Sequence, residues 1–449
     1  MSRRLRTIRL CLASANKNVR GPVPQTTPSG KHASFRLYSA AVKMPSARMP
    51  SASAVVVGAG PGGITVVGNL LEYDSELQTD KQPLVWVDPH FNGGRVNDRY
   101  REVPSNTKVN LFVQFANEVS AFRTVLKTTP KPNAITALEE LPQDKGCRLS
   151  YAADMCLMLT DGLAKDGRIQ QEAANVAIAT LDEQRNIWMV TLDSGETFES
   201  SKMVLCTGST PVSTTIPAID NVSTSMTPVD LDTALAPSEL SKTFDPTDSA
   251  TVAVVGASHS AILVLMNLVA LAQSSHPHLR IKWFTRNKLR YAEYMDGWIL
   301  RDNTGLKGQA ADWARDNLDE NTFSKSPVSD YVTKVWTAGR EDEAYKAELP
   351  ECTHIVQAVG YARNPLPQLQ IAPKSGGPSK PLEVEYDNMS GRFFDKAGPK
   401  QEHIPGLFGA GIAFPERVTD PRGNVEYAVG FWKFMKFIKK VVPNWVNSP

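Results

Sequence analysis

Short apolar runs that end in glycine divide the chain into strand-and-helix units. The first run, Ala54–Val57, leads into Gly58, a pattern that predicts a buried parallel strand followed by a turn. The largely apolar stretch Ile64–Tyr73 then predicts a helix, and Leu84–Val87 predicts a second strand that ends at Asp88. A strand, a glycine turn, a helix and a second strand in this order predict a Rossmann-like unit.

The turn of this first unit has the spacing of a dinucleotide site. Gly58, Gly60 and Gly63 form a GxGxxG pattern, in which the first glycine permits a tight turn. The second lets the backbone approach a pyrophosphate, and the third lets the helix pack against the strand. Asp88 can accept hydrogen bonds from ribose hydroxyls and disfavours a 2′-phosphate. This unit is therefore predicted to bind FAD or NAD.

A second unit of the same kind follows at the stretch VAVVGASHSA. Thr251–Val255 predicts a strand and Gly256 the turn, whereas Ser258 and Ala261 replace the other two glycines. Because both replacements are small, close backbone approach to a ligand survives. His259 at the start of the helix is interpreted as a structural residue. A strand–helix element without a ligand is the alternative.

A basic residue follows the second strand of this unit. Ile262–Leu271 predicts the helix and Ile281–Thr285 the next strand, which Arg286 follows. A guanidinium at this place can form a fork onto a 2′-phosphate, so the unit is predicted to prefer NADPH. Because Lys288 and Arg290 are close by, an ordinary surface charge is the alternative for Arg286.

Further strands run into glycines at three other places. Gly208, Gly360 and Gly411 each follow a predicted strand or lie in a glycine-rich turn, and we expect them to contact a cofactor. The other predicted elements are a small antiparallel meander (Val176–Leu181, Ile187–Leu192 and Thr197–Phe198), strands at Met203–Cys206 and His354–Val359, and helices at Gln309–Leu318 and from about Val425 to Val442.

Charge is distributed unevenly along the chain. Residues 1–53 contain ten Lys and Arg but no Asp or Glu, whereas the remaining residues carry 39 basic and 47 acidic side chains, a net charge of −8. Because residues 54–449 carry a net negative charge, they are a poor candidate for binding nucleic acid. The basic, acid-free segment 1–50 is predicted to be a mitochondrial transit peptide. A disordered tail, or translation from Met44 or Met49 of a cytoplasmic protein, is the alternative.

Two other classes of site are not expected. No apolar run reaches the roughly 18 residues of a membrane span. The five cysteines form no CxxC or metal-ligand spacing, so free thiols and no metal are predicted.

The order of these elements resembles the flavoproteins that carry two dinucleotide-binding domains, over residues 54–442. The stretch FNGGRVNDRYREVPSNTKVNLF, Phe91–Phe112, is similar to the flavin-containing monooxygenases and the related ornithine N-hydroxylases. Gly360-Tyr361 resembles the end of their ATGY element. Ile412 stands where type II NADH dehydrogenases and thioredoxin reductases carry an Asp. The signature FxGxxxHxxxF/Y is absent, so the chain resembles a divergent member.

This resemblance implies an α/β fold with two Rossmann-like parallel-sheet domains, the NADP domain being inserted into the FAD domain. The domains expected are FAD-binding at 51–225 and 346–449 and NADP-binding at 226–345. Asn106 corresponds to the family's active-site Asn; a turn-forming Asn that caps the next segment is the alternative.

The activity implied is an FAD-dependent monooxygenase that uses NADPH and dioxygen, through a C4a-hydroperoxyflavin, to oxygenate a small molecule. The substrate and the oligomeric state are not predicted. A flavin dehydrogenase or oxidase that passes electrons to a quinone or to oxygen, and a non-catalytic redox-sensing flavoprotein, are the alternatives. The segment Tyr291–Leu318 is interpreted mainly as a loop and a packed helix, and alternatively as a substrate-facing lid.

Overall fold

The computed structural model describes residues 49–73, 82–216, 226–398 and 402–447. The described residues belong to one compact unit, Met49–Pro449. The predicted transit peptide lies outside the described residues except for its last two, so the mitochondrial location stays a prediction.

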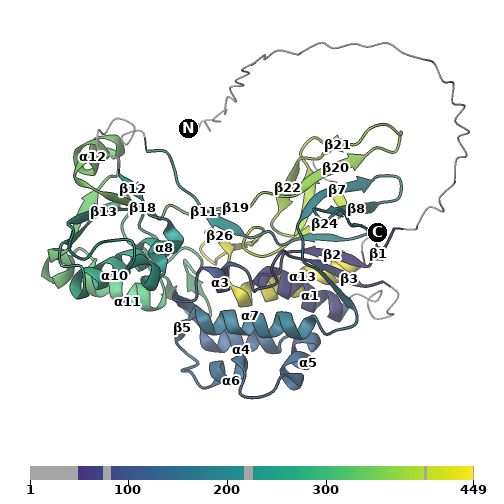
Figure 1. The fold of residues 1–449 in the computed structure, drawn as a ribbon, viewed down its shortest axis with the longest axis horizontal. Helices are drawn as coiled ribbons and strands as arrows, with labels where there is room; N and C mark the ends of the chain where they lie inside the picture. Colours follow the sequence, from purple (N-terminus) through teal and green to yellow (C-terminus); the bar gives the residue numbers. More distant parts are fainter. Residues whose placement is uncertain (1–48, 74–81, 217–225, 399–401, 448–449) are drawn as a thin grey trace, which may run out of the picture. The chain divides into compact units, whose positions relative to one another are not determined.

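A seven-stranded sheet contains the first predicted unit (Figure 1). Five of its strands are parallel, and an antiparallel pair extends one edge. Helices α1 (Pro61–Tyr73) and α13 (Phe431–Val446) pack against each other and share one buried core with strands of this sheet. The strand order is β22 (Val384–Asp387), β23 (Arg392–Asp395), β24 (His403–Gly409), β10 (Met203–Leu205), β2 (Ala54–Val57), β3 (Leu84–Val87) and β6 (Ile169–Glu172).

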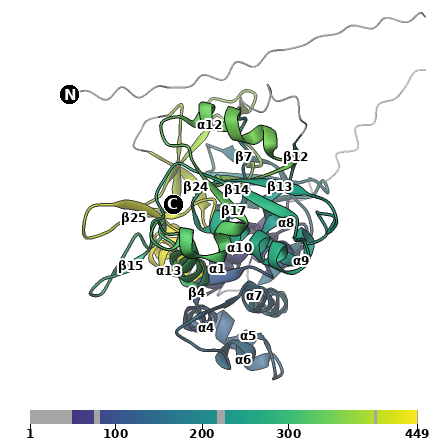
Figure 2. The same ribbon diagram turned by 90° about the vertical axis from the view of Figure 1, so that its left-hand side faces the viewer.

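A second, five-stranded sheet is parallel throughout. Figure 2 shows α10 (His259–Ser274) on one side of it and α12 (Glu341–Glu348) on the other. Figure 1 shows α11 (Gly308–Asn317) on the same side as α10. Separate apolar cores on the two faces confirm a doubly covered Rossmann-like sheet. Its order is β12 (Thr227–Pro228), β18 (His354–Gln357), β13 (Ala250–Val255), β14 (Leu279–Thr285) and β17 (Val332–Trp336). The same part of the chain contains α8 (Leu231–Leu235), α9 (Pro237–Leu240) and the hairpin of β15 (Glu293–Tyr294) and β16 (Ile299–Leu300).

The second sheet is inserted between strands of the first. The chain leaves and returns through β11 (Ser209–Pro211) and β19 (Tyr361–Arg363), which pair antiparallel. The sequence placed the end of the insertion at residue 345, but β18 lies beyond that residue and pairs with β13. The expected boundary therefore differs from the sheet topology, because the partner of a strand is set by contacts distant in sequence.

The predicted meander is confirmed as part of a six-stranded sheet. Its three strands pair antiparallel, with one register shift between Val176 and Ile178. The sequence analysis did not anticipate a group of helices around the short pair β4 (Pro104–Lys108) and β5 (Gly146–Arg148). One helix, α3, precedes β4; α4–α6 connect the two strands, and α7 follows β5. Helices α4–α7 lie below α1 in Figure 1. The six strands are β1 (Ser51–Ala52), β9 (Thr197–Ser200), β8 (Ile187–Leu192), β7 (Val176–Asp182), β20 (Gln368–Ala372) and β21 (Lys380–Pro381). The helices are α3 (Arg95–Asp98), α4 (Val109–Asn117), α5 (Ser120–Thr128), α6 (Ala134–Glu139) and α7 (Leu149–Leu163).

The predicted C-terminal helix begins later than expected. Residues from Val425 onward form strand β26 (Val425–Ala428), which pairs antiparallel with β25 (Glu416–Thr419). Gly430, at φ 139°, has a backbone conformation outside the helical region, so α13 begins at Phe431. Among the described residues, no helix combines the length and apolar character needed to cross a bilayer.

Candidate functional site

The first glycine turn is closed by backbone contacts that exclude side chains. A Cβ on Gly58, at φ 107°, would lie 2.4 Å from the carbonyl oxygen of Cys206. A Cβ on Gly63 would lie 1.8 Å from the carbonyl oxygen of Gly58. Trp86 Nε1 donates a hydrogen bond to that same carbonyl, at 2.9 Å. Strand, turn and helix therefore approach as closely as a dinucleotide turn requires.

Gly60 differs from its neighbours, because a Cβ there would have ordinary room. Its nearest atom would be the carbonyl oxygen of Gly93, at 3.9 Å. The turn is flanked by glycine backbone on two sides. A Cβ on Gly94 would lie 3.2 Å from the Cα of Gly60, and one on Gly62 would lie 2.9 Å from the Cα of Gly411. The result is a cradle without side chains, and the sequence analysis missed Gly62 and Gly94 as members of it.

Asp88 holds the turn from the adjacent strand. Its Oδ2 accepts a hydrogen bond from the backbone N–H of Ala59 at 2.7 Å. Its Oδ1 accepts from the N–H groups of His90 and Phe91, both at 2.8 Å. A carboxylate has about four acceptor positions, so the half-buried Asp88 retains capacity for a ribose hydroxyl.

Unsatisfied polar atoms lie beside the predicted Gly208. The side-chain amide of Asn364 donates a hydrogen bond to the carbonyl oxygen of Thr207 at 2.8 Å. The backbone N–H of Asn364 donates to the carbonyl oxygen of Gly208. The hydroxyl of Thr207 and the amide oxygen of Asn364 are buried and have no partner among the described residues. Buried polar groups are normally hydrogen-bonded, so these two fit a polar ligand at the carboxyl end of β10.

The second turn repeats the construction of the first. A Cβ on Gly256, at φ 135°, would lie 2.4 Å from the carbonyl oxygen of Ala358 and 3.3 Å from the Cβ of the buried Ala261. Trp283 Nε1 donates to the carbonyl oxygen of Gly256 at 2.7 Å, as Trp86 does in the first unit. The sequence signal that could have revealed this pair is a Trp in the second strand of each unit.

A cavity of about 500 Å³ opens at this second turn. The structure brings four predicted residues to its wall: Gly256, Ser258, Arg286 and Gly360. The side chain of Arg286 is 69% exposed and forms one long ion pair, at 3.5 Å, between a guanidinium nitrogen and Glu341. Lys288 and Arg290 also line the cavity, as do the acids Glu341 and Asp342, which the sequence analysis did not single out.

His259 is neutral in this setting. Burial and the nearby ammonium of Lys307 lower the pKa of its imidazole to about 4. Its Nδ1 has no hydrogen-bond partner within the described ranges. The interpretation of His259 as a purely structural residue therefore leaves one buried ring nitrogen unexplained.

Asn106 lies apart from both turns, in strand β4. Its side chain is exposed and makes no hydrogen bond to any described residue. The alternative of a capping Asn is wrong, because the N-cap of α4 is Lys108. Gly308 of α11, in the inserted domain, lies close to Asn106: a Cβ on Gly308 would be 3.7 Å from the Cα of Asn106. The predicted packed helix in Tyr291–Leu318 is confirmed as α11.

Comparison with known proteins identifies the family. A family model described as FAD-NAD(P)-binding matches residues 55–210. Monooxygenase AgnR1 from Paecilomyces divaricatus is 54% identical over 402 residues, which cover 88% of this chain and 98% of that protein. The chain belongs to the two-dinucleotide flavoprotein monooxygenases. A flavin-containing monooxygenase from Stenotrophomonas maltophilia has a similar fold, with a TM-score of 0.50 and 12% identity, covering 88% of this chain and 98% of that one.

This flavoprotein monooxygenase matches an FAD-NAD(P)-binding family model, and the chemistry of its two turns fits a flavin and a nicotinamide dinucleotide. The glycine cradle around Gly60 leaves room for a pyrophosphate, and the unsatisfied atoms of Thr207 and Asn364 require polar partners. The cavity beside Gly256 has three cations within its wall, which suits a phosphorylated ribose.

Proposed function

We propose that the first turn of this enzyme binds FAD, that the inserted domain binds NADPH, and that Asn106 serves the transfer of oxygen to a small organic substrate. One observation carries the two-site assignment: the same construction occurs twice. In each unit an indole N–H holds the carbonyl of the turn glycine, Gly58 or Gly256, against the following helix. Two such turns supply two positive helix ends for two pyrophosphates.

The two sites differ in the residue that meets the ribose. Asp88 presents a carboxylate at the first site, whereas Arg286, Lys288 and Arg290 present cations at the second. A carboxylate repels a 2′-phosphate and a guanidinium binds it, so FAD is assigned to the first site and NADPH to the second. Bound FAD supplies the capacity to accept hydride and to activate dioxygen, while the protein orients the reactants and excludes water.

The replacement Arg286→Ala should raise the Kd for NADPH but leave that for NADH nearly unchanged. A charge-assisted hydrogen bond contributes about 1.5–3 kcal/mol, which corresponds to roughly 10- to 100-fold in affinity. The measurement is the concentration dependence of flavin reduction by each coenzyme. Arg280→Ala is the matched control, because Arg280 is exposed on the same strand, β14, and does not line the cavity. Equal effects of Arg286→Ala on both coenzymes would exclude the phosphate contact.

The proposed activity is tested by following oxygen. The purified protein is reduced with NADPH without oxygen, then mixed with ¹⁸O₂ and a panel of a cyclic ketone, a methyl aryl sulfide and a tertiary amine. We expect reduction of the flavin and ¹⁸O in at least one product. Reoxidation with hydrogen peroxide as the sole product across the panel would favour the oxidase, and a flavin that NADPH does not reduce would favour the redox-sensing alternative.

A further inference from the structure

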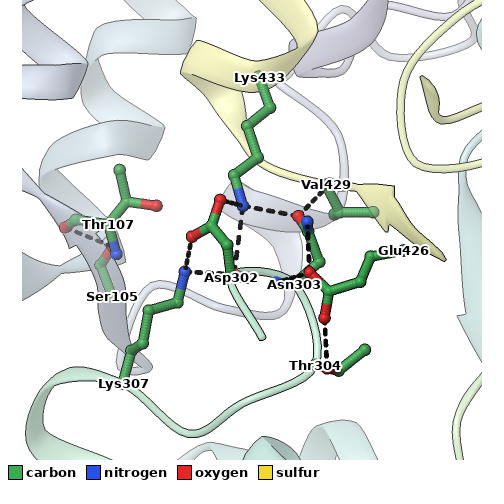
Figure 3. A network of polar contacts seen from close by, with 9 residues as sticks. All are labelled: Ser105, Thr107, Asp302, Asn303, Thr304, Lys307, Glu426, Val429 and Lys433. Atoms are coloured by element: carbon green, nitrogen blue, oxygen red, sulfur yellow. Dashed lines mark hydrogen bonds and ion pairs between the residues drawn. The ribbon is translucent and has the colours of Figure 1, made fainter. Parts of the chain in front are cut away.

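A half-buried ion cluster connects the inserted domain to the C-terminal part of the chain (Figure 3). Asp302, in the loop before α11, forms ion pairs with Lys307 at 2.7 Å and with Lys433 of α13 at 2.8 Å. The side chains of the two lysines are only 12% and 21% exposed. Burial opposes the ionisation of Asp302, but hydrogen bonds from both lysines hold its pKa below the usual range. Asp302 is therefore a carboxylate at neutral pH. Burial and the nearby ammonium of Lys307 lower the pKa of Lys433.

A second carboxylate holds the same loop from strand β26. Glu426, 7% exposed, accepts hydrogen bonds from the backbone N–H of Asn303 at 3.0 Å and from its side chain at 3.1 Å. The hydroxyl of Thr304 also donates to Glu426. Lys433 in turn donates to the amide oxygen of Asn303 at 2.6 Å. A buried carboxylate is costly unless its acceptors are satisfied, so Glu426 strongly favours this one position of the loop.

The loop so held has two functional faces. Thr304 and Leu306 line the cavity at the second turn. Gly308, at φ 58°, brings the start of α11 against Asn106 and the carbonyl oxygen of Ser105, to which a Cβ on Gly308 would lie 3.5 Å away. Figure 3 shows the side chains of Lys307 and Lys433 converging on Asp302. The segment 302–308 is therefore both a wall of the coenzyme cavity and the neighbour of the proposed active-site Asn.

We infer that Asp302, Glu426 and Lys433 are positioning residues, which hold segment 302–308 where it would orient the nicotinamide of bound NADPH for hydride transfer to the flavin. They act through this segment and contact neither coenzyme. The inference rests on the proposed function. It assigns to the cluster a role in alignment, separate from the affinity that the cationic side chains around Arg286 supply in the same cavity. Alignment and affinity are therefore expected to respond to different substitutions.

The test is flavin reduction by NADPH in Glu426→Gln and Asp302→Asn. A small misplacement of reacting groups is sufficient for large losses, so we expect the rate constant at saturating NADPH to fall about tenfold. The Kd from the same titration should change less than about threefold, because the contacts at the adenosine end remain. Both variants should retain FAD, measured by its absorbance, and native circular dichroism. Two variants are used so that misfolding of one leaves the other as the test.

The chain offers a matched control in the same two elements. Glu416 of β25 pairs with Lys440 of α13 at 3.0 Å, on the hairpin and helix that supply Glu426 and Lys433, but has no contact with segment 302–308. In the Glu416→Gln variant, NADPH should reduce the flavin at the wild-type rate. An equal loss in this control, or wild-type rates in both test variants, would overturn the inference alone. A wild-type protein that NADPH does not reduce would overturn the proposed function and the inference with it.

Discussion

Replacing Gly60 with alanine should produce a folded protein that binds FAD weakly. The new Cβ meets nothing closer than 3.9 Å within the described chain, so the polypeptide itself tolerates it. The methyl group would occupy the space in which the backbone of a dinucleotide turn approaches the pyrophosphate. We expect the Kd for FAD to rise roughly 30-fold, about 2 kcal/mol. Titration of the FAD-free protein by calorimetry measures this directly.

Two other glycines show whether that loss is specific. Gly167 has no atom within 4 Å of a built Cβ, so Gly167→Ala should bind FAD as the wild type does. Gly63→Ala should instead unfold the domain, since its Cβ would collide with the carbonyl oxygen of Gly58 at 1.8 Å. Full FAD affinity in folded Gly60→Ala would show that this turn does not hold the pyrophosphate.

Replacing Asn106 with alanine should uncouple NADPH oxidation from oxygen transfer. The amide is exposed and unpartnered in the described part of the chain, so its donor and acceptor are available to bound reactants. Loss of one preorganised donor typically costs about 100-fold in the step it assists. Flavin reduction should continue, and most of the NADPH consumed should appear as hydrogen peroxide. The ratio of peroxide to NADPH measures the change.

The control for this change is an exposed Asn with a local role. Asn117, near the end of α4, donates to the carbonyl oxygen of Val113 within its own helix, so Asn117→Ala should retain normal coupling. FAD content should be unchanged in both variants. If Asn106→Ala transfers oxygen with the same peroxide ratio as the wild type, Asn106 does not belong to the active site.

The elements that could be read from the sequence are those encoded locally. Strand β2 and strand β3 have the predicted bounds, and Asp88 and Arg286 follow their strands as expected. A glycine turn after an apolar run requires only short-range sterics, so its signal is contained in a few consecutive residues.

The two sequence-based predictions that differ from the structure, for residues 425–428 and for β18, have a common cause. Residues 425–428 have enough apolar character for a helix, but pairing with β25 makes them a strand. β18 resembles any buried strand, and its pairing with β13 decides its domain. In both places the conformation is selected by a partner that is distant in sequence, which local propensity does not encode.

The sequence by itself determined that two dinucleotide turns exist, that one presents an acid and the other bases, and which family the chain resembles. Only the tertiary structure decided that Gly62 and Gly94 join the predicted Gly411 around the first turn, and that segment 302–308 lies between the coenzyme cavity and Asn106. The physical reason is the separation in sequence between the residues whose contacts decide each feature. A turn depends on the backbone of neighbouring residues, whereas the burial of Glu426 and Lys433 against the loop depends on packing between parts more than 100 residues apart.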